Sequence, residues 1–208
     1  MVDELISFTP DRAELYAMAG EALLEMGEIG KSIAAYGQAI KHRPNYYLYH
    51  LHRGELMMDG DVLQAEQHLL QSIARLPTVQ GYLLLGQLME RTDRMDRAYD
   101  YFVKAGESDS DPGKQAAKQA KRIDFDKHPD RYIHIKHIRQ GQDKVMLLIT
   151  NINPYQVDLK SLLLTAGQDY RIKLSRTIAP AQSITSTVTI RELGEIEGVR
   201  VDQAELIQ

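Results

Sequence analysis

A helix-pair pattern that recurs at fixed spacing constrains this chain more than any other feature. Residues 13–45, AELYAMAGEALLEMGEIGKSIAAYGQAIKHRPN, carry one apolar stripe, a turn at Gly27, a second apolar stripe and a closing Pro44. Apolar residues at three- and four-residue intervals predict two helices, and the proline marks where the second one ends. Pro77 follows Pro44 by 33 residues. The spacing therefore predicts that the helix pair is repeated.

Three copies of the unit align, each with large and small residues at matching places. The matching residues are Tyr16, Ala19, Gly20, Leu23, Ser32, Tyr36 and Ala39 in the first unit, Tyr49, Leu56, Gly60, Ala65, Leu69 and Ser72 in the second, and Tyr82, Leu85, Gly86, Met89, Ala98, Phe102 and Ala105 in the third. This pattern resembles the tetratricopeptide repeat, a helix-turn-helix unit of about 34 residues. The resemblance implies a stacked array of helices that binds a protein or peptide partner.

The second and third units depart from the pattern at identifiable positions. Arg53 stands where the close-packing glycine belongs, and Gly54 comes one place late, so we expect a shifted or bent first helix in the second unit. In the third unit, Asp93 replaces the turn glycine and the closing proline moves to Pro112.

Residues 113–125, GKQAAKQAKRIDF, have one alanine-rich stripe on an otherwise polar helix. Such a helix suits the open end of a repeat array, which needs a cap with a polar outer side. Its basic side chains, Lys114, Lys118, Lys121 and Arg122, could also form a nucleic-acid patch. The chain as a whole has a net charge of −4, so we favour a solvated cap and expect no nucleic-acid partner.

The sequence changes character after His128. Segments rich in Val, Ile, Thr and Leu, separated by turn residues, predict a small antiparallel β-sandwich. They cover residues 132–138, 144–150, 158–164, 170–174, 183–190 and 198–201. Residues 149–164, ITNINPYQVDLKSLLL, resemble bacterial and plant immunoglobulin-like sandwiches that carry an Asn-x-Asn-Pro-Tyr turn between two core strands. The expected fold class is multidomain, α then β, with the repeat array and its cap over residues 1–128 and the sandwich over 129–208.

Residue patterns for catalysis or metal binding are missing from the sequence. Residues 27–32, GEIGKS, end like a phosphate loop, but Glu25 stands where its first glycine belongs. His50 and His52 are two residues apart on an expected helix, and His134 and His137 three apart on an expected strand, so neither pair shares a face. There is no cysteine. We therefore expect no enzyme activity, no cofactor and no metal site.

The tetratricopeptide resemblance implies that the first helix of each unit lines the concave face of the array. Carrying the family's concave positions onto this sequence gives a candidate partner-binding groove of Tyr47, His50, Leu51, Met57, Met58, Leu83, Leu84, Gln87, Glu90 and Arg91. The lysines and asparagines with which family members hold chaperone C-terminal carboxylates are missing here, so that ligand class is not expected. The remaining aromatic, methionine and leucine surface with an acidic rim predicts a partner that has basic residues.

The interpretation we favour is a non-catalytic interaction or scaffold module that binds a peptide or amphipathic helix in the concave groove. Two alternatives stay open: an accessory or regulatory subunit of a larger enzyme or cell-envelope assembly, and a structural protein whose sandwich occupies the groove. No apolar run approaches the ~20 residues of a membrane span, and residues 1–12 lack the features of a secretory signal. We expect a cytoplasmic protein if the chain is complete, and a periplasmic or cell-envelope protein if an export signal has been removed.

Overall fold

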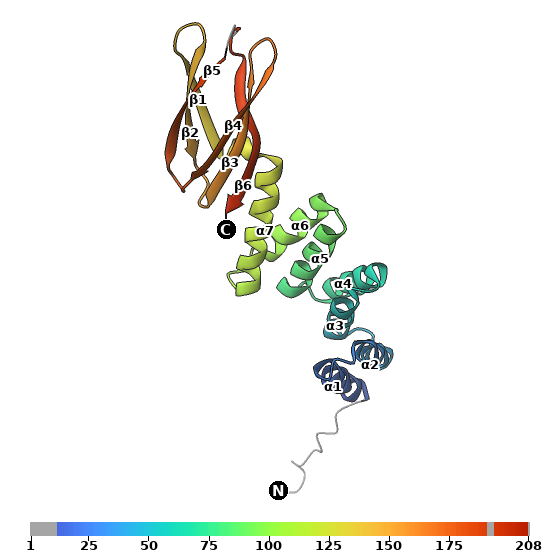
Figure 1. Ribbon diagram of the computed structural model, residues 1–208. Helices are drawn as coiled ribbons and strands as arrows, with labels where there is room; N and C mark the ends of the chain where they lie inside the picture. The colour runs from blue at the N-terminus through green and yellow to red at the C-terminus, as the bar shows by residue number, and fades with distance from the viewer. Residues whose placement is uncertain (1–11, 191–193, 208) are drawn as a thin grey trace, which may run out of the picture. The chain divides into compact units, whose positions relative to one another are not determined.

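The computed structural model describes residues 12–190 and 194–207, and its chain divides into two compact units between Ala120 and Lys121 (Figure 1). Within the described residues, seven α-helices are followed by a short 3₁₀ helix and six strands. The helices are α1 (Arg12–Glu25), α2 (Ile29–His42), α3 (Tyr47–Met57), α4 (Val62–Arg75), α5 (Val79–Arg91), α6 (Met95–Ala105) and α7 (Asp111–Lys127). None of these helices is long and apolar enough to cross a membrane.

The predicted helix pairs are confirmed as α1–α2, α3–α4 and α5–α6, and neighbouring pairs also pack through α2 against α3 and α4 against α5. One close approach recurs inside each pair. A Cβ atom built on Gly20 would lie 2.9 Å from the Tyr36 ring, and one on Gly86 would lie 2.5 Å from the Phe102 ring. Real Cβ atoms do not come this close, so only glycine lets the second helix place its large aromatic residue there.

The second pair makes the same approach one residue later. A Cβ atom on Gly54 would lie 2.9 Å from Leu69, the residue that matches Tyr36 and Phe102. The shift expected for the first helix of this unit is therefore confirmed, with Gly54 in the place of Gly20. As a result His50 and Met57 occupy the positions that match Tyr82 and Met89 of the third unit. Tyr49, which the sequence pattern aligned with Tyr82, is also buried, in a core cluster with Tyr36.

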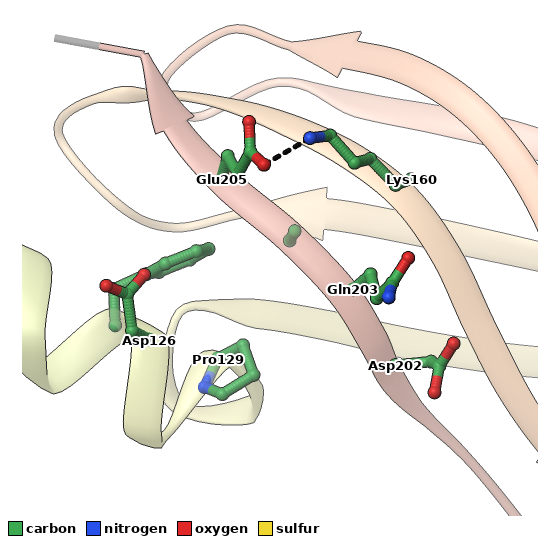
Figure 2. A pocket seen from close by; sticks show the side chains of 8 residues that line it. Asp126, Pro129, Lys160, Asp202, Gln203 and Glu205 are labelled. Carbon is green, nitrogen blue, oxygen red and sulfur yellow. Dashed lines mark hydrogen bonds and ion pairs between the residues drawn. The ribbon is translucent and has the colours of Figure 1, made fainter.

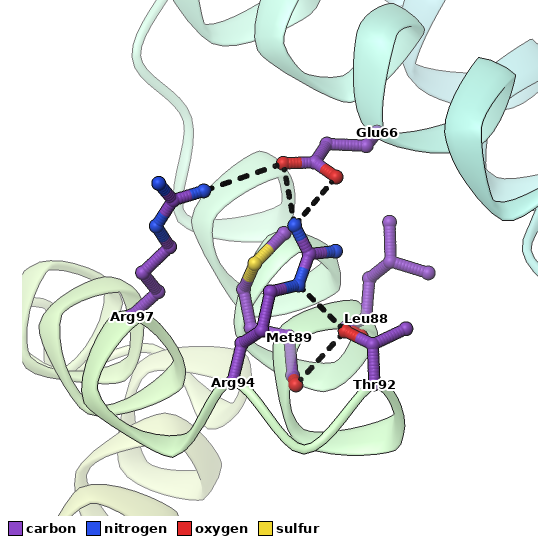
Figure 3. Close-up of polar contacts among 6 residues, drawn as sticks. All are labelled: Glu66, Leu88, Met89, Thr92, Arg94 and Arg97. Atoms are coloured by element: carbon purple, nitrogen blue, oxygen red, sulfur yellow. Dashed lines mark hydrogen bonds and ion pairs between the residues drawn. The ribbon is translucent and has the colours of Figure 1, made fainter.

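A polar cluster joins the second pair to the third (Figure 3). Arg94, at the start of α6, donates from Nη1 to both carboxylate oxygens of Glu66 on α4, at 3.0 and 2.8 Å. Arg94 Nε also donates to the Thr92 hydroxyl at 2.8 Å, and that hydroxyl donates to the Leu88 carbonyl at 2.9 Å. Glu66 is largely shielded from solvent. These bonds fix the turn between α5 and α6 against the preceding repeat.

The boundary between the two compact units lies inside α7. Ala116 and Ala120 in its first part are buried, as expected of a capping helix. Phe125, near its end, is fully buried and belongs to the hydrophobic core of the β unit. The sequence placed the boundary after residue 128; the contacts place it eight residues earlier, because the last turns of the helix carry a core residue of the sandwich.

The β unit is built from two three-stranded antiparallel sheets that share one core. The first sheet has the order β1-β2-β5 and the second the order β4-β3-β6. The strands are β1 (Ile133–Arg139), β2 (Lys144–Asn151), β3 (Gln156–Thr165), β4 (Asp169–Ile178), β5 (Ser183–Thr189) and β6 (Gly198–Ile207), with the 3₁₀ helix η1 at Pro129–Arg131. Every segment predicted as a strand forms one. Alternate residues of β2 and β3, such as Leu147 and Leu159, are fully buried between the sheets.

The Asn-x-Asn-Pro-Tyr segment carries the chain from β2 in one sheet to β3 in the other. Asn151 is fully buried, and its amide nitrogen donates to the carbonyls of Tyr155, Ile178 and Ala179 at 2.9 to 3.3 Å. Its Oδ1 accepts from Asn153 N at 2.9 Å, and Asn153 Oδ1 in turn accepts from Tyr155 N at 3.0 Å. The two asparagines therefore satisfy backbone groups that the turn leaves without strand partners.

Candidate partner-binding face of the helical repeats

The candidate partner-binding residues lie on α3 or directly after it, and on α5, the first helices of the second and third units. Six of these are buried, namely His50, Leu51, Met57, Met58, Leu83 and Leu84. Tyr47, Gln87 and Glu90 are half-buried, and Arg91 is exposed. The six buried side chains pack inside the array, so they are not exposed anchors. In the second unit the one-residue shift explains why: it turns Met57 from the surface into the helix pair.

His50 has a structural role at its shifted position. Its Nε2 donates to the Pro44 carbonyl at 2.9 Å, so its Nδ1 is left to accept from Nδ1 of His68 at 3.2 Å. Burial lowers the pKa of His50, and burial together with the nearby Arg53 lowers the pKa of His68 to about 4. Both imidazoles are therefore neutral at physiological pH. The pair takes the place that the stacked Tyr82 and Tyr101 rings occupy in the third unit.

The shift brings other residues to the outer side of α3. With Gly54 as reference, the positions that match Glu21 and Glu25 of α1 are Glu55 and Asp59, and both are exposed. His52, on the same helix, stacks on the Tyr36 ring of α2 at 5.4 Å and lies 3.9 Å from Glu55. These residues are missing from the candidate set. Aligning Gly54, in place of Arg53, with Gly20 and Gly86 would have identified these residues from the sequence.

Acidic residues recur along this row of first helices. Each unit places one acid in or just after the last turn of its first helix: Glu25, Asp59 and Glu90. The first two units add Glu21 and Glu55 one turn earlier, where the third has Gln87. The positive charge nearest these acids on α5, Arg91, forms a 2.8 Å ion pair with Asp59. We call the five acids Glu21, Glu25, Glu55, Asp59 and Glu90 the acidic row.

Apolar surface accompanies the acidic row on α1. Met18 is 59% exposed and Leu24 is 43% exposed. Met18 lies three residues before Glu21, and Leu24 three residues after it, so all three share one face of the helix. A partner that contacts this face meets methionine and leucine side chains beside carboxylates. In chemical terms the face offers hydrophobic contact and negative charge.

Metal ligands are not gathered on this face. Across residues 12–190 and 194–207, no group of three or more His, Cys, Asp or Glu side chains is arranged to hold a metal ion.

Comparison with known proteins identifies the repeat. Residues 13–46 match the family model of the tetratricopeptide repeat. No curated protein matches the sequence.

Solved structures similar to the helical unit are tetratricopeptide domains. The Sgt2 domain from Aspergillus fumigatus is 20% identical, with a TM-score of 0.51 over 58% of this chain and 83% of its own. The TPR2B domain of yeast Sti1, solved as its pHsp70 complex, is 14% identical, with a TM-score of 0.51 over 55% and 98%. The first domain of Spaghetti (RPAP3), bound to the HSP90 peptide SRMEEVD, is 13% identical, with a TM-score of 0.51 over 55% and 92%. At these identities the likeness shows the fold: the helical unit of this chain has the fold of tetratricopeptide-repeat domains, its residues 13–46 match the repeat's family model, and an antiparallel β domain follows.

Proposed function

We propose that this protein is a non-catalytic interaction module whose repeat domain binds a basic segment of a partner protein along α1, α3 and α5. The observation that carries this proposal is the acidic row, in which Glu21 and Glu25 of the first repeat match Glu55 and Asp59 of the second, and Glu90 of the third lies one place before the matching position. A single surface acid says little about binding. Acids that recur with the repeat line up along the array, and they favour a partner with positive charges spaced along an extended or helical segment.

The acidic row also argues against one class of ligand. The HSP90 peptide in the Spaghetti complex, SRMEEVD, contains two glutamates and an aspartate. A peptide of this kind would meet like charge at Glu21, Glu55 and Glu90, and like-charge contact lowers affinity. The proposed partner is therefore chemically opposite to that peptide, with lysine or arginine beside apolar residues that cover Met18 and Leu24.

The test is a binding measurement with two peptides on the full chain, followed by fluorescence anisotropy. One is an 18-residue amphipathic peptide with lysines on one face and leucines on the other; the second is SRMEEVD. We expect the basic peptide to bind more tightly, with an affinity that falls as salt is raised. The double variant Glu21→Lys/Glu55→Lys should weaken its binding about tenfold, on the scale of two lost charge contacts.

The matched control reverses two acids away from the acidic row. Asp100, on α6, and Asp109, after it, are exposed, and Asp100→Lys/Asp109→Lys changes the net charge by the same amount. This control should leave basic-peptide affinity nearly unchanged. Equal loss in both double variants would mean that the peptide responds only to overall charge, and tighter binding of SRMEEVD would contradict the proposal directly.

A further inference from the structure

The pocket beside β6 in the β unit already has its charges paired. Its volume is about 400 Å³, and Figure 2 shows Asp126 on one side of it and β6 on the other. The charged residues that line it form the ion pairs Arg122–Asp126, Lys160–Glu205 and Arg171–Asp202. A ligand in this pocket would have to compete with these pairs. The free end of the repeat array is a different kind of surface.

The first helix of the array, α1, has an exposed apolar face. Leu15 is 51% exposed and Met18 is 59% exposed, and Ala19 and Ala22 are exposed as well. These residues are three and four apart, so they form one stripe along the helix. Met26 continues the stripe one turn further and is 74% exposed. We call Leu15, Met18, Ala19 and Ala22 the open face of α1.

The matching residues of α5 are covered. With the close-packing glycines of the two helices aligned, the open face matches Gly81, Leu84, Leu85 and Leu88. All four are buried, Leu85 and Leu88 completely. Gly81 lies directly against the preceding helix α4, because a Cβ atom built on it would be 2.6 Å from Cγ2 of Ile73. On α5, therefore, a helix packs over the positions that are open on α1.

The matching residues of α3 lie against its own preceding helix, α2. They are Tyr49, His52, Arg53 and Leu56. Arg53 Nη1 lies 3.3 Å from the position of a Cβ atom on Gly37 of α2. Tyr49 and Leu56 pack in one hydrophobic cluster with Ile40 of α2. Two interfaces inside the array thus show which element covers these positions, and in both it is an α-helix.

The charge beside the open face favours a basic helix. Glu21 and Glu25 are exposed and border the stripe. Burial, and after it the charges of Glu21 and Glu55, raise the pKa of Tyr36 on α2 to about 12. An acid on α3 thus acts on the helix that covers α3. Because Glu21 matches Glu55, it would act in the same way on a helix that covers α1, and a lysine or arginine there would meet opposite charge.

The same charge disfavours two other occupants. A second copy that pairs antiparallel through its own open face brings its Glu21 and Glu25 to the same border. The residues before α1, MVDELISFTPD, contain three acidic side chains and no basic one. In contrast α2, which covers α3, carries Lys31 and Lys41 and no acidic residue. Like charge therefore opposes the first two occupants, and a basic helix from another protein fits.

We propose that the open face of α1 binds a basic amphipathic helix of a partner protein, which extends the array by packing on α1 as α2 packs on α3. Its apolar stripe covers Leu15 and Ala22, and its lysines or arginines lie towards Glu21 and Glu25. The site shares these two acids with the acidic row but lies on α1 alone. Charge reversal at Glu55 therefore separates the two sites.

The probe is a synthetic peptide with the sequence of residues 29–44, IGKSIAAYGQAIKHRP, which includes the helix that covers α3. It is added to the full chain, and its affinity is measured by fluorescence anisotropy. Its location is measured by NMR of the methionine methyl groups. The signals of Met18 and Met26 should shift, and that of Met146 on β2 should not. A peptide with Ile40→Asp, which places a charge in the apolar stripe, should bind at least tenfold more weakly.

The double variant Leu15→Lys/Ala22→Lys should weaken the peptide at least tenfold, because two charges would then face its apolar side and its lysines. The matched control is Leu63→Lys/Ala74→Lys on α4, which makes the same two changes at exposed positions. It should leave the affinity nearly unchanged, and so should Glu55→Lys. No binding at ~1 mM peptide, equal loss in the two double variants, or unchanged signals of Met18 and Met26 would overturn the proposal.

Two further measurements test the other occupants. A dimer of the free chain that Leu15→Lys/Ala22→Lys dissociates would assign the face to a second copy and overturn the proposal. Ile6 lies nine residues before Leu15, as Ile40 lies nine before Tyr49 in the α2–α3 contact. Because the chain has no cysteine, Ile6→Cys/Leu15→Cys can be compared with Ile6→Cys/Leu24→Cys, whose second cysteine lies on the opposite side of α1. Equal disulfide yields are expected; a higher yield in the first pair would assign the face to the chain's own residues and overturn the proposal.

Discussion

One glycine in each helix pair of the repeat domain lies directly against a large side chain of the facing helix, and this contact sets how closely the two helices pack. Gly86 lies so near the Phe102 ring that any side chain must displace it, whereas Gly30, at the start of α2, has nothing within 4 Å of the position of a Cβ atom. The same residue type therefore has opposite consequences at these two positions. Close packing, and not a need for backbone freedom, accounts for the glycines at Gly20, Gly54 and Gly86.

The variant Gly86→Ala should destabilise the repeat domain by about 1–3 kcal/mol, because the added methyl group overpacks the contact with Phe102. In Gly30→Ala the methyl group meets solvent and improves helix propensity, so stability should rise by about 0.5–1 kcal/mol. Urea unfolding followed by circular dichroism at 222 nm measures both. If both variants shift the free energy of unfolding in the same direction, the close contact between Gly86 and Phe102 does not account for the requirement for glycine.

The His50–His68 pair should make the repeat domain sensitive to acid. Both pKa values lie below the ordinary 6.5 in the folded state, that of His68 at about 4, so between these values the unfolded chain binds more protons than the folded one. Stability should therefore fall as pH drops from about 6.5 towards 4. The facing charges, Arg53 and Arg75, disfavour protonation further.

The measurement is the melting temperature at pH 7 and at pH 5, followed at 222 nm. In His68→Gln the decrease between these values should be smaller than in the unchanged protein, since one of the two protonation sites is gone. His137→Gln, at an exposed position on β1, serves as the control and should keep the full decrease. If His68→Gln also keeps it, the acid sensitivity has its source elsewhere.

At the scale of elements, the connection from β2 to β3 depends on one buried amide. Asn151→Ala would leave the Ile178 carbonyl without its donor and release the turn at Asn153. We expect a loss of about 2–3 kcal/mol, the cost of leaving buried polar groups unsatisfied. Ile152→Ala, at a side chain that is 48% exposed in the same turn, should change stability by less than ~0.5 kcal/mol. Urea unfolding monitored by tyrosine fluorescence compares the two, and similar values would refute the role of the amide.

At the scale of the whole molecule, the structure predicts where the chain separates into stable parts. Because Phe125 belongs to the sandwich core, a fragment of residues 113–208 should fold, while a fragment of residues 129–208 should lose about 3–5 kcal/mol, comparable to truncating a buried phenylalanine. Amide dispersion in NMR spectra and urea midpoints report the difference. Equal stability of the two fragments would place the boundary after residue 128, as the sequence pattern suggests.

The local pattern of the sequence was sufficient for the elements and their order. Helix pairs follow from the three- and four-residue spacing, and strands from alternation between turn residues, because both periods are properties of the backbone. Gly27 and Asp93 both adopt positive φ, at 77° and 57°, where the repeat needs a left-handed residue. The asparagine-rich turn was recognisable for a related reason, since the bonds that shape it run between residues close in sequence.

Tertiary packing decided what the sequence could not. Whether the close approach of the second helix pair falls at Arg53 or at Gly54 depends on Leu69 of the facing helix, and that contact moved Met57 into the interior. Phe125 belongs to the β core although it lies on a helix, and Asp130 bonds to Val201, 71 residues later. Helical period alone determines which residues share a face. Only the neighbouring elements determine whether that face is covered, because burial depends on atoms distant in the chain.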